Sequence, residues 1–119
     1  MYTLPKSERL NGRTAVSALM SKGRWGFARG LKYCYLCNEP AEGPNRMMVS
    51  VPKRLFKRAV RRNLLKRRMR EAYRLQKSFL EPRAIDILLL YNSQEILDFQ
   101  AILEQVGSIL KKIGDEGQL

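Results

Sequence analysis

The sequence predicts a single small α+β domain over residues 1–119, in which helices pack on a mixed β-sheet. The length suits one compact domain, and the 45% apolar residues are enough to build its core. Apolar residues alternate with other residues in some segments, as in strands, and recur three and four residues apart in others, as in helices. The order helix, strands, helix, strand, helix places a helix between two strands, which favours a parallel pair in the sheet. The order of the strands stays open.

A first helix is expected over Arg13–Lys22. It would start near Asn11 or Thr14 and end at Gly23, because glycine commonly follows the last turn of a helix. Three apolar residues share the helical spacing, namely Val16, Leu19 and Met20. The helix therefore has one modest apolar face to bury.

Two strands are expected next. Trp25–Gly30 contains two glycines and is interpreted as an irregular connection. Leu31–Cys37 alternates in the manner of a strand. Asn38–Asn45, with two prolines and a glycine, indicates a loop, and Met47–Val51 predicts the second strand.

The second half of the chain predicts a helix, a strand and a helix. Arg58–Phe79 has no Gly or Pro and is expected to be one long helix. Ala84–Tyr91 is almost continuously apolar, which predicts a central strand buried on both faces. Asp98–Ile113 has the spacing of an amphipathic helix that packs on a core, and residues 114–119 are expected to form a short polar tail.

The charge of the chain indicates a polyanionic partner. The formal net charge is +12, a surplus that would otherwise only add self-repulsion to the folded state. Residues 1–80 hold 20 Lys and Arg against 4 Asp and Glu, whereas residues 81–119 hold 3 against 7. The basic surface is therefore one region of the molecule, and nucleic acid is the first candidate for its partner.

No segment of the sequence indicates export or a membrane. The N-terminal residues are polar, and the longest apolar stretch, Ile87–Tyr91, is too short to cross a bilayer. We therefore expect a soluble, cytoplasmic protein without a membrane partner.

Cys34 and Cys37 form the one Cys-x-x-Cys motif of a chain that has no histidine. A zinc site needs about four ligands, and a redox motif of this kind usually opens a helix after a strand. Here the motif lies in a predicted strand, where residues three apart point to opposite faces. We expect two reduced structural cysteines, and no metal or other cofactor bound by the protein.

The long central helix carries the clearest functional pattern. Lys53–Lys77 contains 12 Lys and Arg and a single acid, Glu71. Like charges four residues apart destabilise a helix, so such a one-sided run indicates an anionic partner. At 100° per residue, an apolar arc is expected to face the core, made of Leu64, Leu65, Met69, Ala72, Tyr73, Leu75 and Phe79. The opposite arc is a basic stripe, made of Asn63, Lys66, Arg67, Arg70 and Arg74.

Three further residues of this helix have individual expectations. Arg61 and Arg62 fall in its first turn, where backbone N–H groups and the helix dipole also favour phosphate. Arg68 lies at the edge of the apolar arc and is expected to pack its stem rather than to bind a partner. Elsewhere on the stripe, the planar guanidinium groups suit phosphate or guanine edges.

The residues Val60–Arg74, V-R-R-N-L-L-K-R-R-M-R-E-A-Y-R, resemble the signature of the bacterial ribonuclease P protein family, roughly A-V-x-R-N-x-x-K-R-x-x-R-E-A-aromatic-R. Leu4–Leu10, Ser50–Arg54 and Asp86–Ile87 are similar to further elements of the family, so the resemblance covers about residues 4 to 113. The chain departs from the pattern at Leu64, where the family has an arginine, and at Phe56-Lys57-Arg58, where it has Gly-Asn. Val16 and Met20 stand where many members carry phenylalanine.

The resemblance implies a basic helix that lies in a left-handed βαβ crossover and docks on the catalytic RNA of ribonuclease P. With the residues that flank it, the expected RNA-binding set is Lys53, Arg54, Arg61, Arg62, Asn63, Lys66, Arg67, Arg70 and Arg74. A cleft between the first helix and the sheet would bind the single-stranded 5′ leader of precursor tRNA. Its expected lining is Val16, Met20 and Tyr33 or Tyr35, although strand core is an equal alternative for the tyrosines.

Trp25 and Phe27, which lie between Arg24 and Arg29, have two interpretations. They could stack on RNA or pack within the loop, and packing is favoured because large aromatic residues are mostly buried.

The sequence has no catalytic constellation of its own, because it has no histidine and only Glu71 in its basic region. The resemblance implies a monomeric subunit of an endoribonuclease in tRNA 5′ maturation. The catalytic centre and Mg²⁺ would then lie with the RNA. A ribosomal protein or an RNA chaperone is the main alternative. A DNA-binding regulator or a membrane-surface protein fits less well, since the apolar arc is needed for the core.

Overall fold

The computed structural model describes residues 4–117 and contains a four-stranded mixed sheet. Its strands are β1 (Arg24–Ala28), β2 (Leu31–Cys37), β3 (Arg46–Ser50) and β4 (Ile85–Tyr91), in the order β1-β2-β4-β3. β2 is antiparallel to both β1 and β4, whereas β3 and β4 are parallel. The predicted parallel pair is therefore confirmed.

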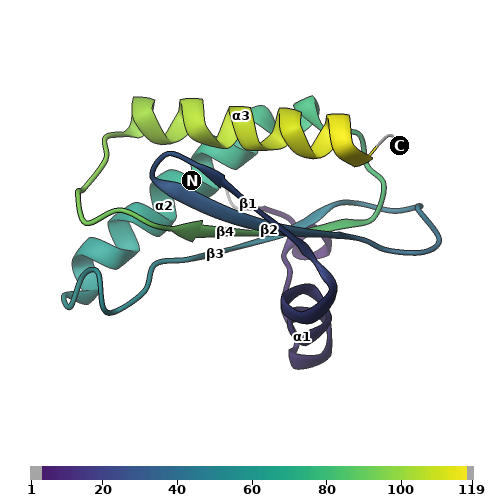
Figure 1. Cartoon of the computed structure of the whole chain (residues 1–119), viewed down its shortest axis with the longest axis horizontal. Coiled ribbons are helices and arrows are strands. Elements are labelled where there is room, and N and C mark those ends of the chain that lie inside the picture. Colours follow the sequence, from purple (N-terminus) through teal and green to yellow (C-terminus); the bar gives the residue numbers. More distant parts are fainter. Residues whose placement is uncertain (1–3, 118–119) are drawn as a thin grey trace.

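Helices cover both faces of this sheet (Figure 1). α2 (Ala59–Gln76) and α3 (Phe99–Gly117) lie on one face, and α1 (Arg13–Lys22) lies on the other. Short 3-10 turns, η1 (Lys6–Glu8) and η2 (Lys77–Phe79), precede α1 and follow α2. Because β3 and β4 are adjacent and parallel, α2 is the crossover helix between them.

The core is divided unequally by the sheet. The larger cluster fills the space between the sheet and the helices α2 and α3, with Tyr33, Met69, Leu89 and Ile109 among its fully or almost fully buried members. The smaller cluster, under α1, consists of Leu10, Leu19, Cys34 and Leu88. β4 is buried on both sides, as its apolar run predicts. Its one charged residue, Asp86, receives two hydrogen bonds of 2.8 Å from Arg46.

The structure corrects three expectations about the elements. Residues 24–28 form the strand β1, so most of Trp25–Gly30 is not irregular. The final helix extends through Gly117, so residues 114–117 of the expected polar tail are helical, and residues 118–119 of that tail lie outside the described residues. Leu75 and Phe79 are 51% and 48% exposed, so the apolar arc of α2 is narrower than predicted. Its buried residues are Leu65, Met69, Ala72 and Tyr73.

Gly26 explains why β1 was not recognised in the sequence. A Cβ atom at this position would lie 2.4 Å from the ring of Tyr33, which is the residue paired with Gly26 on β2. The glycine therefore makes room for the Tyr33 ring at the edge of the sheet. A glycine in a short segment normally indicates a turn, and only the pairing with β2 shows its role in a strand.

The two cysteines are free and differ in their surroundings. Cys34 is buried under α1, where its thiol donates a hydrogen bond of 3.4 Å to the Leu19 carbonyl. A Cβ atom on Gly23 would lie 2.5 Å from the Cys34 sulfur, so the end of α1 sits directly on β2. Burial raises the pKa of the Cys34 thiol. Cys37, at the exposed end of β2, is not part of the core.

Candidate nucleic-acid interface

The basic stripe of α2 borders a groove of about 1090 Å³. The groove lies between α2, strand β3 and the segment of residues 4–11. Asn63, Lys66, Arg67 and Arg70 all line it, and all except the half-buried Lys66 are exposed. The structure therefore brings together the residues that the sequence placed on one arc of the helix.

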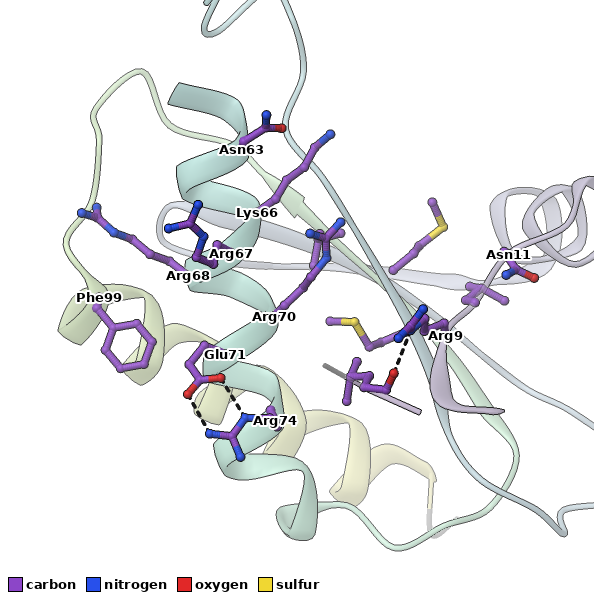
Figure 2. Close-up of a pocket in the computed structure, with 15 residues that line it drawn as sticks. Arg9, Asn11, Asn63, Lys66, Arg67, Arg68, Arg70, Glu71, Arg74 and Phe99 are labelled. Carbon is purple, nitrogen blue, oxygen red and sulfur yellow. Dashed lines mark hydrogen bonds and ion pairs between the residues drawn. The ribbon is translucent and has the colours of Figure 1, made fainter. Parts of the chain in front are cut away.

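The wall opposite α2 was not predicted. Figure 2 shows Arg9 and Asn11 on the N-terminal segment, across the groove from the α2 side chains. This segment is held against the sheet edge by a hydrogen bond of 2.9 Å from the Leu10 N–H to the Met47 carbonyl. The Arg9 guanidinium donates to the Leu4 carbonyl at 2.7 Å. No sequence pattern indicated this wall, because it depends on β3 being an edge strand.

The groove combines cations with an apolar floor. Four of its lining residues are buried and apolar: Leu4, Leu10, Met47 and Val49. Guanidinium and ammonium groups can meet phosphates, while the apolar floor can accept the faces or edges of bases. The groove is thus chemically suited to RNA, in which both groups occur together.

Arg74 differs from the other cations of the stripe because it forms an ion pair with Glu71. Its guanidinium donates two hydrogen bonds, of 2.7 and 2.8 Å, to the Glu71 carboxylate (Figure 2). The hydrogen bond with Arg74 lowers the pKa of Glu71. The signature acid therefore neutralises one end of the stripe and leaves the positive charge concentrated on Lys66, Arg67 and Arg70.

Two arginines of α2 have structural roles. Arg62 donates hydrogen bonds of 2.8 Å to the carbonyls of Phe56 and Lys57, and so holds the loop that leads into the helix. Arg68 lines the groove and donates a hydrogen bond of 2.6 Å to the Leu97 carbonyl. The departure from the family pattern at residues 56–58 thus lies in a loop that Arg62 holds.

The remaining predicted cations flank the groove residues along the chain. Lys53 and Arg54 are exposed in the turn after β3, and Arg61 is exposed in the first turn of α2. No side chain caps the start of α2, and its first turn contains no acid. The beginning of the helix is therefore uniformly positive.

Of the two alternatives for Tyr33 and Tyr35, the structure supports strand core rather than the lining of a leader cleft. Tyr33 and Tyr35 are 4% exposed and belong to the core that faces α2 and α3, not to the face under α1. Their rings stack with centroids 6.5 Å apart, and the Tyr35 hydroxyl donates to Glu116 at 2.5 Å. Burial raises the pKa of Tyr35 to about 12, and Glu116 adds to the increase. The alternation in the sequence shows that every second residue of β2 shares a face, but it does not show which face of the sheet that is. A shift of the strand by one residue would move each side chain to the opposite face.

On the α1 side, β2 presents Lys32, Cys34 and Leu36, and β1 presents Trp25 and Phe27. Val16 is half-buried and Met20 is 48% exposed on α1 itself. Trp25 and Phe27 do not pack within a loop, because they are 41% and 61% exposed on a strand. The favoured interpretation of the two aromatic residues, packing within a loop, is therefore wrong.

Two features are absent from the residues that the structure describes. Residues 4–117 contain no group of three or more His, Cys, Asp or Glu side chains that could hold a metal ion. Within the same range, no helix is long and apolar enough to span a membrane.

Comparisons with known proteins agree with this geometry. The family model described as Ribonuclease P matches residues 4–114. The Ribonuclease P protein component of Porphyromonas gingivalis is 37% identical over 108 residues, which cover 85% of this chain and 79% of the relative. The solved structure of the RNase P protein from Thermotoga maritima has a TM-score of 0.76 and 25% identity, covering 89% of this chain and 97% of that one. The structure of the Staphylococcus aureus RNase P protein has a TM-score of 0.73 and 26% identity, covering 91% and 95%.

The match extends over nearly all the described residues and includes the basic helix with its groove. It favours the expected ribonucleoprotein role in tRNA processing over a ribosomal protein or an RNA chaperone. The chain belongs to the bacterial ribonuclease P protein family.

Proposed function

We propose that this chain docks on the catalytic RNA of ribonuclease P through the basic face of α2 and assists removal of the 5′ leader from precursor tRNA. The observation that carries the proposal is the groove beside α2, where Asn63, Lys66, Arg67 and Arg70 adjoin an apolar floor. Family membership supplies the RNA partner, and the one-sided charge of this helix supplies the means of binding it.

In this proposal the protein positions RNA and the RNA performs the chemistry. The groove contains one carboxylate, Glu71, which is paired with Arg74 and so is poorly suited to act as a general base. The described residues offer no nucleophile beside a base at the groove. Mg²⁺ would be held mainly by the RNA, and the cations of α2 would reduce the repulsion between the phosphates that assemble around it.

The precursor would also contact the protein near α1. Val16 and Met20 remain candidates for the single-stranded leader, because both lie on α1 and neither is fully buried. Tyr33 and Tyr35 are excluded by their burial on the other face.

The direct test is reconstitution with the catalytic RNA and an end-labelled precursor tRNA at low Mg²⁺. We expect the protein to stimulate leader removal, because its cations replace screening that Mg²⁺ would otherwise provide. The protein without RNA should not cleave the precursor at any Mg²⁺ concentration. Absence of stimulation would refute the proposal. So would metal-dependent cleavage by RNA-free protein that survives ribonuclease-inhibitor controls.

A further inference from the structure

The N-terminal segment, residues 4–11, wraps around the sheet edge formed by β3. Leu4 is buried in the large cluster between the sheet and α2, whereas Leu10 is buried in the small cluster under α1. Between them, Arg9 pairs with Met47 as an isolated parallel bridge. Covering part of an edge strand protects its backbone groups from pairing with other chains. This role accounts for the two leucines, but not for the charged residues between them.

An ion pair joins the N-terminal segment to the end of α2. The Lys77 ammonium of η2 lies 2.9 Å from the Glu8 carboxylate, and the Glu8 side chain is 19% exposed. Neither residue lines the groove. The segment and α2 form the two facing walls of the groove, and the ion pair links the segment to the turn that directly follows α2. The pair therefore helps to fix the separation of the two walls.

The side chain of Arg9 is exposed and lines the groove. Its Nε atom donates to the Leu4 carbonyl at 2.7 Å, which orients the guanidinium group. Figure 2 shows Arg9 across the groove from Arg67 and Arg70 of α2. Among residues 4–117, the two terminal amino groups of Arg9 have no hydrogen-bond partner. They are therefore available to a ligand in the groove.

The fold holds cations on both walls of the groove, although like charges that face each other repel. The acid that lines the groove, Glu71, is paired with Arg74 and does not offset the charge of Arg9. A movement of the N-terminal segment away from α2 would relieve the repulsion. The buried leucines, the backbone hydrogen bond to Met47 and the Glu8–Lys77 pair oppose that movement. An anionic ligand between the walls would remove the repulsion instead.

We propose that Arg9 is a further RNA-binding residue, which binds a phosphate of the catalytic RNA from the wall opposite α2, and that Glu8 positions Arg9 through its ion pair with Lys77. A guanidinium group binds phosphate through two parallel hydrogen bonds. RNA in the groove is then contacted from two sides, by Arg9 and by the basic stripe of α2. Because the N-terminal segment is fixed before RNA binds, little ordering of this wall accompanies binding. The inference rests on the proposed function, since it requires the catalytic RNA to occupy this groove.

Glu8→Gln separates positioning from general attraction. The substitution removes the ion pair and adds one unit of positive net charge, so attraction by net charge predicts equal or tighter binding of the catalytic RNA. Positioning predicts the opposite, a loss of affinity by roughly threefold or more, within the range of a partly exposed ion pair. Titration of labelled catalytic RNA with the full-length protein at constant salt measures the difference. An affinity equal to or above that of wild type would overturn the role of Glu8.

Arg9→Ala and Lys6→Ala are matched variants, because each removes one positive charge from the same segment. Lys6 is exposed and does not line the groove. Arg9→Ala should weaken binding of the catalytic RNA roughly tenfold, as for a charge-assisted contact, and should lower the salt dependence of the affinity. Lys6→Ala should change the affinity little. Equal affinities of the two variants, at unchanged circular dichroism, would reject Arg9 as a binding residue.

A double-mutant cycle tests whether Glu8 acts through Arg9. In the Arg9→Ala background, Glu8→Gln should have no further effect on affinity, because the residue that it positions no longer carries the guanidinium group. A purely structural effect of Glu8 would lower the affinity equally in both backgrounds. Equal losses in the two backgrounds would therefore contradict positioning.

The two proposals fail separately. If Arg67→Ala weakens binding of the catalytic RNA while Arg9→Ala and Lys6→Ala behave alike, the second wall is rejected and the proposed function stands. If binding depends on Arg9 but the wild-type protein does not stimulate precursor cleavage, the proposed function is rejected and the contact by Arg9 stands.

Discussion

α2 and α3 lie on the same face of one sheet and have nearly equal lengths, yet their outer surfaces are opposite in character. α2 buries Leu65, Met69, Ala72 and Tyr73 and presents a row of cations to the groove. α3 buries Ile102, Val106, Ile109, Leu110 and Ile113, and has only Lys111 and Lys112 as basic residues. The fold needs one apolar face from each helix, and both provide it.

The helices therefore differ in their outer faces, whose residues the packing of the fold does not determine. α3 has an outer face of mixed polarity, as a solvated helix does. α2 carries cations that repel one another when no partner is present. The RNA proposed as its partner would neutralise these cations, so the proposal assigns binding to α2 and only packing to α3.

The largest effects on stability are expected from substitutions in the buried apolar faces, which both helices have. Leu65→Ala in α2 and Ile109→Ala in α3 each remove a fully buried side chain. Each should lower the free energy of unfolding by roughly 2–5 kcal/mol, from lost burial and the cavity left behind. Urea denaturation measures both. A loss below about 1 kcal/mol in either variant would mean that its helix is less firmly packed than the structure shows.

The next prediction concerns the outer faces of α2 and α3, which differ in charge. Arg67→Ala or Arg70→Ala should weaken binding to the catalytic RNA by roughly 1–3 kcal/mol, as for charge-assisted contacts. The helix should persist, because alanine is the best helix former. Lys111→Ala and Lys112→Ala on α3 should change affinity little. Binding assays over a range of salt concentrations give both the affinity and the number of phosphates neutralised.

Equal losses from the two helices, at unchanged helicity, would remove the distinction between them. Binding would then be diffuse attraction by the net charge, and a docking face on α2 would have to be abandoned. A weaker dependence of RNA affinity on salt in the α2 variants alone would sharpen the distinction. A variant that makes fewer phosphate contacts releases fewer counterions when it binds.

The cysteines test a region remote from the basic face of α2. Replacing Cys34 and Cys37 together with alanine should lower stability by about 1 kcal/mol, mostly from Cys34, which is buried under α1. RNA affinity should stay within a few-fold of wild type, because neither residue lies in the groove. Stoichiometric zinc in the purified wild-type protein would contradict the structural role assigned to them.

The last prediction is a loss of stability at high pH, which is expected from Tyr73 in α2 and from Tyr35 in β2, whose hydroxyl contacts Glu116 of α3. Burial raises the pKa of Tyr73 in α2 to about 12, and burial with the Glu116 hydrogen bond from α3 raises that of Tyr35 to about 12. Unfolding lets both ionise near their ordinary pKa of 10. Their contribution to stability is therefore complete below pH 10 and is lost as the pH rises toward 12.

Tyr73→Phe and Tyr35→Phe should each flatten this decline in pH-dependent denaturation curves, because phenylalanine does not ionise. An identical decline in both variants and in wild type would show that other groups cause it. A flattening in only one variant would assign the pH sensitivity of stability to that tyrosine.

Much of the fold was predictable because its signals are local. The apolar run of β4 and the alternation of β2 gave their strands, and the arc of Asn63, Lys66, Arg67 and Arg70 placed the basic face on α2. β1 could not be predicted, because it contains Gly26. The glycine is needed there to make room for the Tyr33 ring on β2, and this contact is not visible in the sequence. The positions of Arg9 and Asn11 in the groove could not be predicted either, because they depend on β3 lying at the edge of the sheet.

The two alternatives for Tyr33 and Tyr35 stayed open in the sequence for the same reason. Alternation shows that the two share a face, but the choice of face depends on which helices lie above each side of the sheet. The same choice placed Trp25, Phe27 and Lys32 together on the opposite side. The uncertainty over which face each set of residues occupies therefore accounts both for the burial of the two tyrosines and for the exposure of Trp25 and Phe27.

The small cluster under α1 has a consequence for hydrogen exchange. α1 has a single buried residue, Leu19, whereas the strand β4 is buried along almost its whole length. Regions with few buried contacts open at a lower free energy than the core does. Amide protons of α1 should therefore exchange by detachment of this helix alone, while those of β4 exchange only when the whole domain unfolds. The face of the sheet that carries Trp25 and Phe27 is thus adjacent to the part of the fold that opens most readily.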